Sequence, residues 1–245
     1  MLEEKHDFFR FPWEGFPDCI IHAEENAVRG AVSYHAAKTG DSNAAYELVD
    51  SFLDDACIEQ IEKISDDIEA TAPITLVSAH ALEREGVNAI PEAMAELLGT
   101  RLGWEVEHQI VQTNIVSHTK ADGFSRLAKQ AAFEGDVSYG KSYLLVDDFI
   151  GQGGTLANLR GWILSRGGRV VGATVLTGKA YSAKLAVEQT RIDELENTHG
   201  KGLRRWWQNR FGFDYACLTS SEARYLIRTP TADRIRNRIA AAVKK

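Results

Sequence analysis

Residues 143–156 read YLLVDDFIGQGGTL, so four apolar or aromatic residues run directly into Asp147 and Asp148 and a turn with three glycines follows. A short apolar run that ends at such a turn is typical of a buried strand, because glycines interrupt regular structure. Residues 153–168 then show helical spacing of apolar side chains. The stretch therefore predicts a strand, a sharp turn and a helix, the opening of a βαβ unit.

The chain on either side continues this alternation. Strands are predicted at residues 73–79, 106–112, 142–147 and 169–178, and helices at residues 89–103 and 153–168. Strands that alternate with helices in this way favour a mainly parallel sheet with helices on both faces. We therefore expect an α/β fold with a doubly wound, mainly parallel sheet.

Helical spacing also predicts segments outside this core. Helices are expected over residues 42–68, 183–196, 202–212, 219–227 and 231–243, while residues 213–218 suit a strand. Thr219 and Glu222 form a capping box at the start of one of these helices. We expect residues 1–70 to be an aromatic arm and helices that pack on the core, residues 71–180 to be the core, and residues 181–245 to be a mostly helical, basic extension. All three parts are expected to form one compact domain.

Composition narrows the class of protein. The hydrophobic content of 44% can fill a substantial core, and the three cysteines are far apart without a CxxC motif, so neither a disulfide framework nor a zinc site is predicted. The acidic start of the chain has no apolar signal region, and no window approaches the ~18 apolar residues of a membrane span. We expect a soluble cytoplasmic protein without a membrane partner.

The charge is unevenly distributed. The net charge is -7, yet residues 200–245 carry eleven Lys and Arg against three acidic residues. A basic segment can bind nucleic acid, or it can pack on the acidic body of its own or a neighbouring subunit. The amphipathic, aromatic pattern of the segment favours packing, and a homodimer is expected. The basic C-terminus nevertheless leaves a nucleic-acid partner open.

The turn after Asp148 is suited to binding an anion. Gly151, Gly153 and Gly154 allow backbone N–H groups to approach a phosphate, and the N-terminus of the following helix adds further donors. Two carboxylates would repel that phosphate unless they face another part of the ligand, such as vicinal hydroxyl groups. The stretch therefore predicts a ligand with a phosphate and a nearby diol, which describes a ribose 5-phosphate. It lacks the Lys-Ser or Lys-Thr of a P-loop.

The segment LLVDDFIGQGGT resembles the 5-phosphoribosyl-1-pyrophosphate (PRPP) binding motif of type I phosphoribosyltransferases. The resemblance implies that Asp147 and Asp148 hold the ribose hydroxyls, and that Mg²⁺ is bound near them indirectly, through PRPP. It also implies a set of residues around the 5-phosphate: Phe149, Ile150, Gly151, Gln152, Gly153, Gly154 and Thr155. Gln152 departs from the family, which usually has Thr or Ser there.

The resemblance implies further parts of such a site. The pyrophosphate would lie against the loop after the first core strand, at Ser78, Ala79 and His80. Gly86 and Asn88 in this region are similar to a GxN element of competence-protein ComF relatives. His80 also suits an ordinary surface histidine.

A basic loop of the family covers the site, and its place here is residues 113–140. Lys120, Arg126 and Lys129 would be its basic residues, although residues 123–133 also suit an ordinary helix. Base contacts would come from Lys179 and Tyr181, or from aromatic residues near the N-terminus, which also suit packing.

Two functions fit these features. The first is a phosphoribosyltransferase that transfers the 5-phosphoribosyl group of PRPP to a nitrogenous base or related small nitrogen acceptor and releases pyrophosphate. The second is a catalytically silent protein that senses PRPP or a nucleotide and acts on nucleic acid or a protein partner. Fold and motif alone do not separate them.

Overall fold

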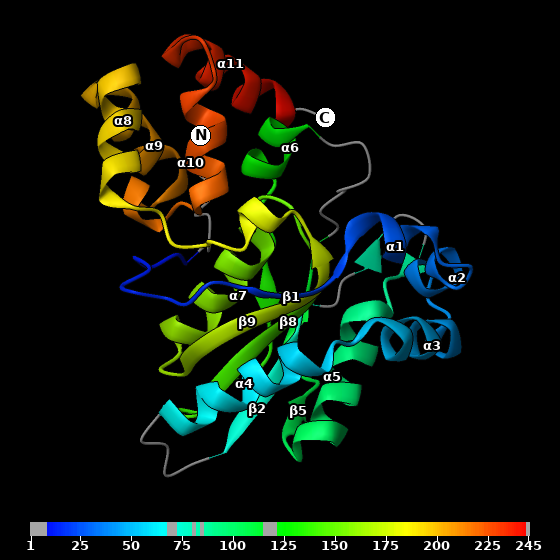
Figure 1. Ribbon diagram of the computed structural model, residues 1–245. Coiled ribbons are helices and arrows are strands. Elements are labelled where there is room, and N and C mark those ends of the chain that lie inside the picture. Colours follow the sequence, from blue (N-terminus) through cyan, green and yellow to red (C-terminus); the bar gives the residue numbers. More distant parts are fainter. Residues whose placement is uncertain (1–8, 68–72, 80–81, 84–85, 115–121, 244–245) are drawn as a thin grey trace.

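The computed structural model describes residues 9–67, 73–79, 82–83, 86–114 and 122–243. Within these residues a five-stranded sheet forms the centre of the molecule, in the order β1, β9, β8, β2, β5 (Figure 1). The strands are β1 (Ile20–Glu24), β9 (Arg169–Gly178), β8 (Ser142–Ile150), β2 (Ile74–Ser78) and β5 (Glu105–Glu107). Every neighbouring pair is parallel, so the prediction of an α/β fold with a mainly parallel sheet is confirmed.

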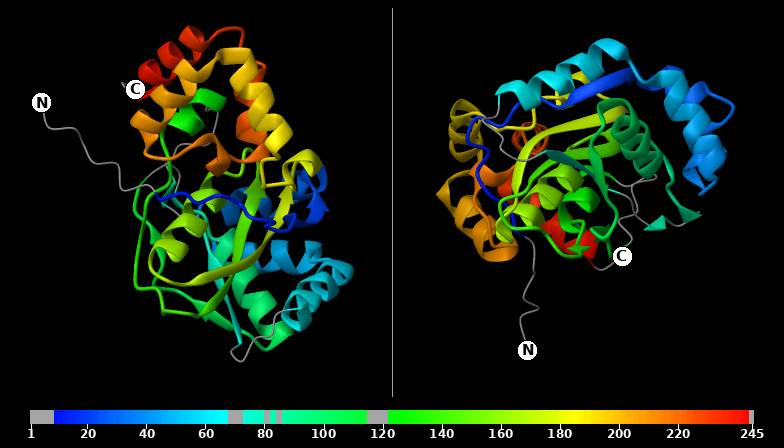
Figure 2. Two further views of the ribbon diagram at one scale, coloured as in Figure 1. Left: turned by 90° about the vertical axis from the view of Figure 1, so that its left-hand side faces the viewer. Right: turned by 90° about the horizontal axis from the view of Figure 1, so that it is seen from below.

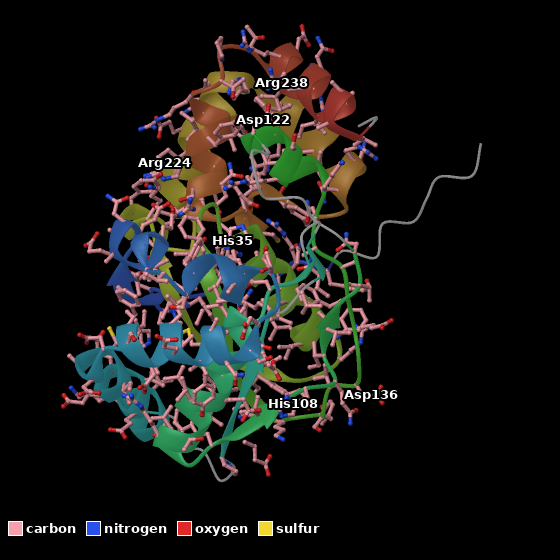
Figure 3. All side chains as sticks on the ribbon, turned by 90° about the vertical axis from the view of Figure 1, so that its right-hand side faces the viewer. His35, His108, Asp122, Asp136, Arg224 and Arg238 are labelled. Atoms are coloured by element: carbon pink, nitrogen blue, oxygen red, sulfur yellow. The ribbon has the colours of Figure 1, made fainter. Side chains whose placement is uncertain are left out.

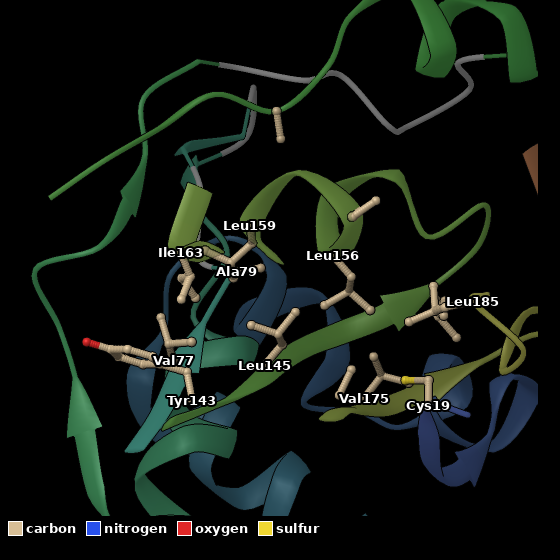
Figure 4. Packing of buried hydrophobic residues seen from close by; sticks show 14 of the residues in the cluster. Cys19, Val77, Ala79, Tyr143, Leu145, Leu156, Leu159, Ile163, Val175 and Leu185 are labelled. Atoms are coloured by element: carbon tan, nitrogen blue, oxygen red, sulfur yellow. The ribbon is translucent and has the colours of Figure 1, made fainter. Parts of the chain in front are cut away.

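Helices cover both faces of the sheet. On one face, α7 (Gly154–Ser165) packs on β8 and β9, and Tyr143 and Leu145 of β8 share a core cluster with Leu156, Leu159 and Ile163 of α7 (Figure 4). On the other face, Leu144 and Val146 pack with α3 (Ser42–Phe52), α4 (Asp55–Asp67) and α5 (Ile90–Leu102). This alternation along β8 follows from the two-residue period of a strand, and a strand buried on both faces is apolar throughout.

The N-terminal part contributes a strand that the sequence analysis did not predict. β1 pairs with β9 at the edge of the sheet, and α1 (Glu25–Gly30) and α2 (Tyr34–Lys38) follow it. The predicted helical stretch at residues 42–68 forms two helices, α3 and α4. Leu53 takes an extended backbone, and Asp54 accepts a hydrogen bond from the backbone N–H of Cys57, which starts the next helix.

The C-terminal part forms a helical cap above one end of the sheet (Figures 1 and 2). We use "cap" for α8 (Gln189–His199), α9 (Lys201–Phe211), α10 (Ser220–Ile227) and α11 (Ala232–Val243). Their apolar faces enclose a core of their own around Trp207, Phe211 and Tyr215. The short helix α6 (Gly123–Ala128) also packs into this core through Phe124 and Leu127.

Three predicted elements differ from the structure. Residues 106–112 do not form one strand, because β5 ends at Glu107 and β6 (Val111–Gln112) pairs instead with β7 (Phe133–Glu134). The predicted helix at residues 183–196 begins only at Gln189. The predicted strand at 213–218 is wrong: residues Tyr215–Cys217 form a 3₁₀ turn, since the Asp214 side chain accepts from the N–H of Ala216. The capping box of Thr219 and Glu222 is confirmed.

The connections around β2 and β8 define where a ligand can approach. The chain leaves β2 through α5 on one face toward β5, and leaves β8 through α7 on the other face toward β9. The two strands are neighbours, so their carboxyl ends mark the topological switch point of the sheet. A short antiparallel pair, β3 (Leu82–Glu83) and β4 (Gly86–Val87), follows β2. No helix in the described part of the chain is both long enough and apolar enough for a bilayer.

Candidate functional site

A cavity of about 490 Å³ opens at the carboxyl end of β8. It is lined by β8, the glycine turn, the start of α7, α2, and the segment around α6. Its described lining consists of Arg10, Arg29, Tyr34, His35, Lys38, Ala79, Asn88, Gln112, Arg126, Lys129, Gln130, Ala131, residues 147–156, Asn158 and Glu222. A volume of this size accommodates a small phosphorylated metabolite.

Asp147 and Asp148 form one wall of this cavity. Each is 8% exposed, and alternation along β8 turns their side chains to opposite faces of the sheet. Asp148 Oδ2 lies 2.7 Å from Lys38 Nζ on α2, while Asp147 Oδ1 accepts the backbone N–H of Asp148 at 2.8 Å. Each carboxylate therefore has a defined partner and still borders the cavity.

The pKa values of the two carboxyl groups are shifted in opposite directions. Burial and the neighbouring charge of Asp148 raise the pKa of Asp147 well above its usual range. Burial also acts to raise the pKa of Asp148, but the ammonium of Lys38 and hydrogen bonds, including one with Asn88, outweigh it and lower the pKa. Asp148 is thus held ionised, whereas Asp147 gains most from a nearby hydroxyl donor or cation.

The glycine turn presents its backbone N–H groups without internal partners. Gly153 has φ of 78°, the left-handed region, and a Cβ there would lie 2.5 Å from Leu185 Cδ2, so only glycine fits. Gly153 is also the N-cap of α7, and a glycine has no side chain with which to cap the helix. Among the described residues, the N–H groups of residues 151–155 have no hydrogen-bond partner. These donors and the positive end of α7 favour an anion.

Basic side chains surround the same turn. The guanidinium of Arg126 lies so close to Gly151 that a Cβ on this glycine would be 2.9 Å from Nη1. Arg29 stacks on the ring of Phe149, 5.1 Å from its centroid, and Lys129 adds another charge to the lining. Burial, and secondarily Arg29, lower the pKa of Arg126 from its ordinary value. An anion placed here would reduce the repulsion between these two guanidinium groups.

All seven residues of the predicted 5-phosphate site lie along this cavity: Phe149, Ile150, Gly151, Gln152, Gly153, Gly154 and Thr155. Ala79 lines it as well, but Ser78 is fully buried and donates to Glu92 Oε2 at 2.6 Å. His80 and Lys120 lie outside the described residues.

Lys179 and Tyr181, the predicted base contacts, are not part of the described lining. Lys179 pairs with Glu25, and the exposed ring of Tyr181 stacks with Arg224, whose Cζ is 4.0 Å from the ring centroid. Their role in base recognition stays a prediction.

The structure adds polar residues that sequence reasoning missed. Arg29, Tyr34, His35 and Lys38 reach the cavity from α1 and α2, and His35 is labelled in Figure 3. Gln112, Gln130, Asn158, Arg10 and Glu222 line it from other parts of the chain. No local motif marks these residues.

Comparison with known proteins gives a sequence relationship and weaker structural ones. No known family model matches the chain. The protein TraN of Escherichia coli is 38% identical over 234 residues, which cover 95% of this chain and 51% of TraN. An uncharacterised protein of Haemophilus influenzae is 34% identical over 163 residues, covering 66% of this chain and 36% of that protein. The chain thus spans about half or less of these relatives. They do not support the expected likeness to ComF relatives.

Several solved structures of phosphoribosyltransferases are distantly similar. Adenine phosphoribosyltransferase of Thermoanaerobacter pseudethanolicus is 19% identical with a TM-score of 0.31, covering 51% of this chain and 70% of its own. The Leishmania donovani adenine enzyme is 10% identical with a TM-score of 0.37, covering 76% and 80%. Leishmania donovani UMP synthase is 15% identical with a TM-score of 0.30, covering 84% and 43%. The fold assignment above rests on the strand order of this chain and not on these weak likenesses.

Proposed function

We propose that this protein is a phosphoribosyltransferase, which binds PRPP with Mg²⁺ and transfers its 5-phosphoribosyl group to a nitrogen atom of a small acceptor. One observation carries the proposal: a single cavity brings together two buried carboxylates, several basic side chains and a glycine turn whose N–H groups have no partner among the described residues. A ligand that satisfies all three must carry hydroxyl groups and more than one anionic group. PRPP has this combination.

The groups of PRPP match the polarity of the cavity wall. Its 5-phosphate would accept from the N–H groups of residues 151–155, and its ribose hydroxyls would donate to Asp147 and Asp148. Arg126 and Lys129 would balance the charge of the pyrophosphate. Lys38 keeps Asp148 ionised before the ligand arrives, since it holds the carboxylate at 2.7 Å.

The residues present fit Mg²⁺ only in an indirect way. Within the described residues, Asp147 and Asp148 belong to no group of three or more ligands that could enclose an ion. Mg²⁺ commonly binds through one or two carboxylates together with waters and substrate phosphates, so coordination by PRPP suits this pair. When bound, the ion would offset the negative charge that grows on the departing pyrophosphate.

The proposed transfer needs no covalent intermediate with the protein. The acceptor nitrogen forms a bond to C1 of the ribose as the C1–O bond breaks, and pyrophosphate leaves with that electron pair. A proton carried by the nitrogen passes to solvent. The ionised Asp148 and its neighbour Asp147 would stabilise positive charge on the ribose, and Arg126 and Lys129 would stabilise the negative charge on the leaving group.

The first test measures binding and turnover in the same protein. PRPP with Mg²⁺ is expected to raise the melting temperature, and incubation with PRPP and a panel of purines, pyrimidines and other nitrogen acceptors should release pyrophosphate and form a new nucleotide, detected by mass analysis. Binding without product for any acceptor would instead favour the PRPP sensor. No thermal shift would contradict both functions.

Substitution of the acidic pair gives a sharper prediction. Asp147→Asn with Asp148→Asn should abolish the thermal shift by PRPP, because neutral amides no longer balance Lys38 or attract the ribose hydroxyls as strongly. Asp136→Asn is the matched control, since Asp136 is exposed and is not part of the described lining (Figure 3). An unchanged shift in the double variant would show that the ribose lies elsewhere.

A further inference from the structure

The carbonyl oxygens of the glycine turn are held by side chains from distant parts of the chain. Ser182 Oγ donates to the carbonyl of Gly151, and Thr219 Oγ1 donates to the carbonyl of Gln152. Arg10 Nη2 makes a longer contact of 3.4 Å with the carbonyl of Gly154. Within residues 151–154, three carbonyl groups are therefore held by side chains from outside the turn.

The donors are themselves firmly placed. Ser182 and Thr219 are each 1% exposed, and Arg10 is 8% exposed. Ser182 lies in the short turn η1 (Ala180–Ser182) after β9, and Thr219 is the N-cap of α10 in the cap. Thr219 Oγ1 also accepts the N–H of Glu222 at 3.0 Å, so its single proton remains for the glycine turn.

A hydrogen bond that fixes a backbone carbonyl also fixes the direction of the N–H group in the same peptide unit. In a trans peptide the C=O of one residue and the N–H of the next point in opposite directions. The bonds from Ser182, Thr219 and Arg10 therefore direct the N–H groups of Gln152, Gly153 and Thr155 away from these donors. None of the three N–H groups has a partner among the described residues, and all three residues line the cavity.

We propose that Ser182 and Thr219 are positioning residues that hold the glycine turn as a preformed phosphate site. The ligand class is a phosphate monoester such as ribose 5-phosphate or the 5-phosphate end of PRPP. The segment after β9 and the cap would then be part of the phosphate site, although neither contributes an N–H to it. This inference rests on the proposed function for the identity of its ligand, but not for its test with phosphate alone.

The hydroxyl network supplies a matched pair of variants. Ser182 Oγ and Ser221 Oγ are 3.1 Å apart, and Ser182 already donates its proton to Gly151, so Ser221 must donate to Ser182. Ser182→Ala removes the bond to the turn. Ser221→Ala removes a neighbouring buried hydroxyl and leaves that bond intact. Thr219→Ser keeps the hydroxyl that donates to the carbonyl of Gln152. Thr219→Val removes this donor together with the acceptor for the N–H of Glu222 at the start of α10.

The experiment uses inorganic phosphate with protein labelled by ¹⁵N-glycine, and ribose 5-phosphate in calorimetry. Phosphate should shift the amide signals of Gly151, Gly153 and Gly154 in the native protein and in Ser221→Ala. In Ser182→Ala these shifts should require about tenfold more phosphate, because the turn is no longer held and a carbonyl loses its partner. Ribose 5-phosphate should lose affinity to a similar extent, while Thr219→Ser should bind it nearly as well as the native protein.

The outcomes separate this inference from the proposed function. Native-like phosphate shifts in Ser182→Ala and Thr219→Val would overturn the positioning role, and absent shifts in the native protein would overturn the phosphate site itself. Phosphate shifts without binding of PRPP, or without transfer, would contradict the proposed function and leave the positioning role supported. Equal losses in Ser182→Ala and Ser221→Ala would mean that any lost hydroxyl disturbs the turn, which also overturns the role.

Discussion

The ion pair of Lys38 and Asp148 shows how two adjacent carboxylates are tolerated in a buried position. Asp148 keeps its charge because Lys38 lies 2.7 Å away, while Asp147 has a backbone N–H as partner and an elevated pKa. Two ionised carboxylates side by side would repel, and separation of their pKa values is the common result. A hydroxyl-rich ligand therefore meets the ionised Asp148, which accepts hydrogen bonds strongly, and Asp147, whose carboxyl group can form a further hydrogen bond.

His22 on β1 is a second residue whose charge depends on its surroundings. Its Nδ1 accepts the backbone N–H of Asp54 at 3.1 Å, so the ring proton lies on Nε2, 3.1 Å from Thr174 Oγ1. Thr174 Oγ1 in turn donates to the carbonyl of Ile20 at 3.2 Å. A second proton on the ring would meet the N–H of Asp54, so the neutral form is favoured.

We predict that His22 makes the protein sensitive to acid. Burial, as the largest cause, lowers the pKa of His22 from 6.5 to about 4. Between these values the unfolded chain binds the extra proton, so stability is present above pH 6.5 and falls as pH drops toward 4, by about 3 kcal/mol in total. Denaturant unfolding at several pH values should show this slope, and His22→Gln should flatten it.

The exposed His35 serves as the control for this experiment. His35→Gln should retain the slope of the native protein between pH 6.5 and 4. A slope that persists unchanged in His22→Gln would mean that other groups cause the loss of stability.

At the scale of elements, α6 joins the basic wall of the cavity to the cap. Phe124 packs edge-on against Tyr225 of α10, with ring centroids 5.0 Å apart, and Asp122 pairs with Arg238 of α11. Figure 3 labels Asp122 and Arg238 side by side at the top of the molecule. Arg126 extends from this anchored helix to the glycine turn, so its position depends on α10 and α11.

We predict that Gly123→Ala weakens this connection. A Cβ at Gly123 would lie 2.4 Å from the ring of Tyr225, so the packing of α6 on this ring must shift, at a cost of about 1–3 kcal/mol in stability. We expect pyrophosphate affinity to fall as well, because a displaced α6 carries Arg126 away from its position at the glycine turn. Thermal melts and calorimetry with pyrophosphate measure the two effects.

Gly202→Ala is the matched control, since both glycines lie in the first turn of a helix. Its Cβ would meet nothing closer than Arg236 Nη2 at 3.9 Å. We expect a gain of about 0.4–1 kcal/mol and an unchanged pyrophosphate affinity. Similar losses in the two variants would argue against the steric explanation.

The elements predicted well are those whose signal is local. β9 matches its predicted range, and β8, α5 and α7 lie within a few residues of theirs, because uninterrupted apolar runs and helical periods extend over their whole length. β1 was missed, since its apolar run is short and His22 interrupts it. Residues 183–188 were predicted as helix, but Ala186 forms an isolated antiparallel bridge with Thr219, a long-range contact that a helix at this position would not make.

The candidate site likewise contains residues that a local sequence motif predicts and residues that it does not. Asp147, Asp148 and the glycine turn are consecutive in sequence, so a motif predicts them together. Lys38, Arg10 and Glu222 reach the cavity from positions far from this motif. Only tertiary packing brings them there, and a single sequence contains no local record of it.

At the scale of the whole molecule, Arg10 joins the N-terminal segment to α7 and to the cap. Its guanidinium pairs with Glu222 at 2.7 Å and donates to Asn158 Oδ1 at 2.6 Å. The side chains of Arg10 and Glu222 are each only 2% exposed. The buried ion pair of Arg10 and Glu222 therefore holds the N-terminal segment against α7 and the cap.

We predict that Arg10→Met destabilises the protein by about 3–5 kcal/mol, because it leaves the carboxylate of Glu222 buried without its charge partner. Denaturant unfolding measures this loss. Arg236→Met is the control: Arg236 pairs with Asp233 at 2.8 Å near the surface, and its loss should change stability by less than about 1 kcal/mol. Comparable losses for both variants would contradict the special role of the buried pair.

The edge position of β1 also has a consequence for how the chain reaches its final form. Ile20 and Ile21 pair with Thr174 and Val175, about 150 residues later, and Arg10 meets Glu222, 212 residues away. During synthesis Arg10 and β1 have no docking place until β9 and α10, which lie later in the chain, have emerged from the ribosome. We therefore expect the N-terminal segment to dock only after β9 and α10 have formed, so that its docking depends on the correct folding of both elements.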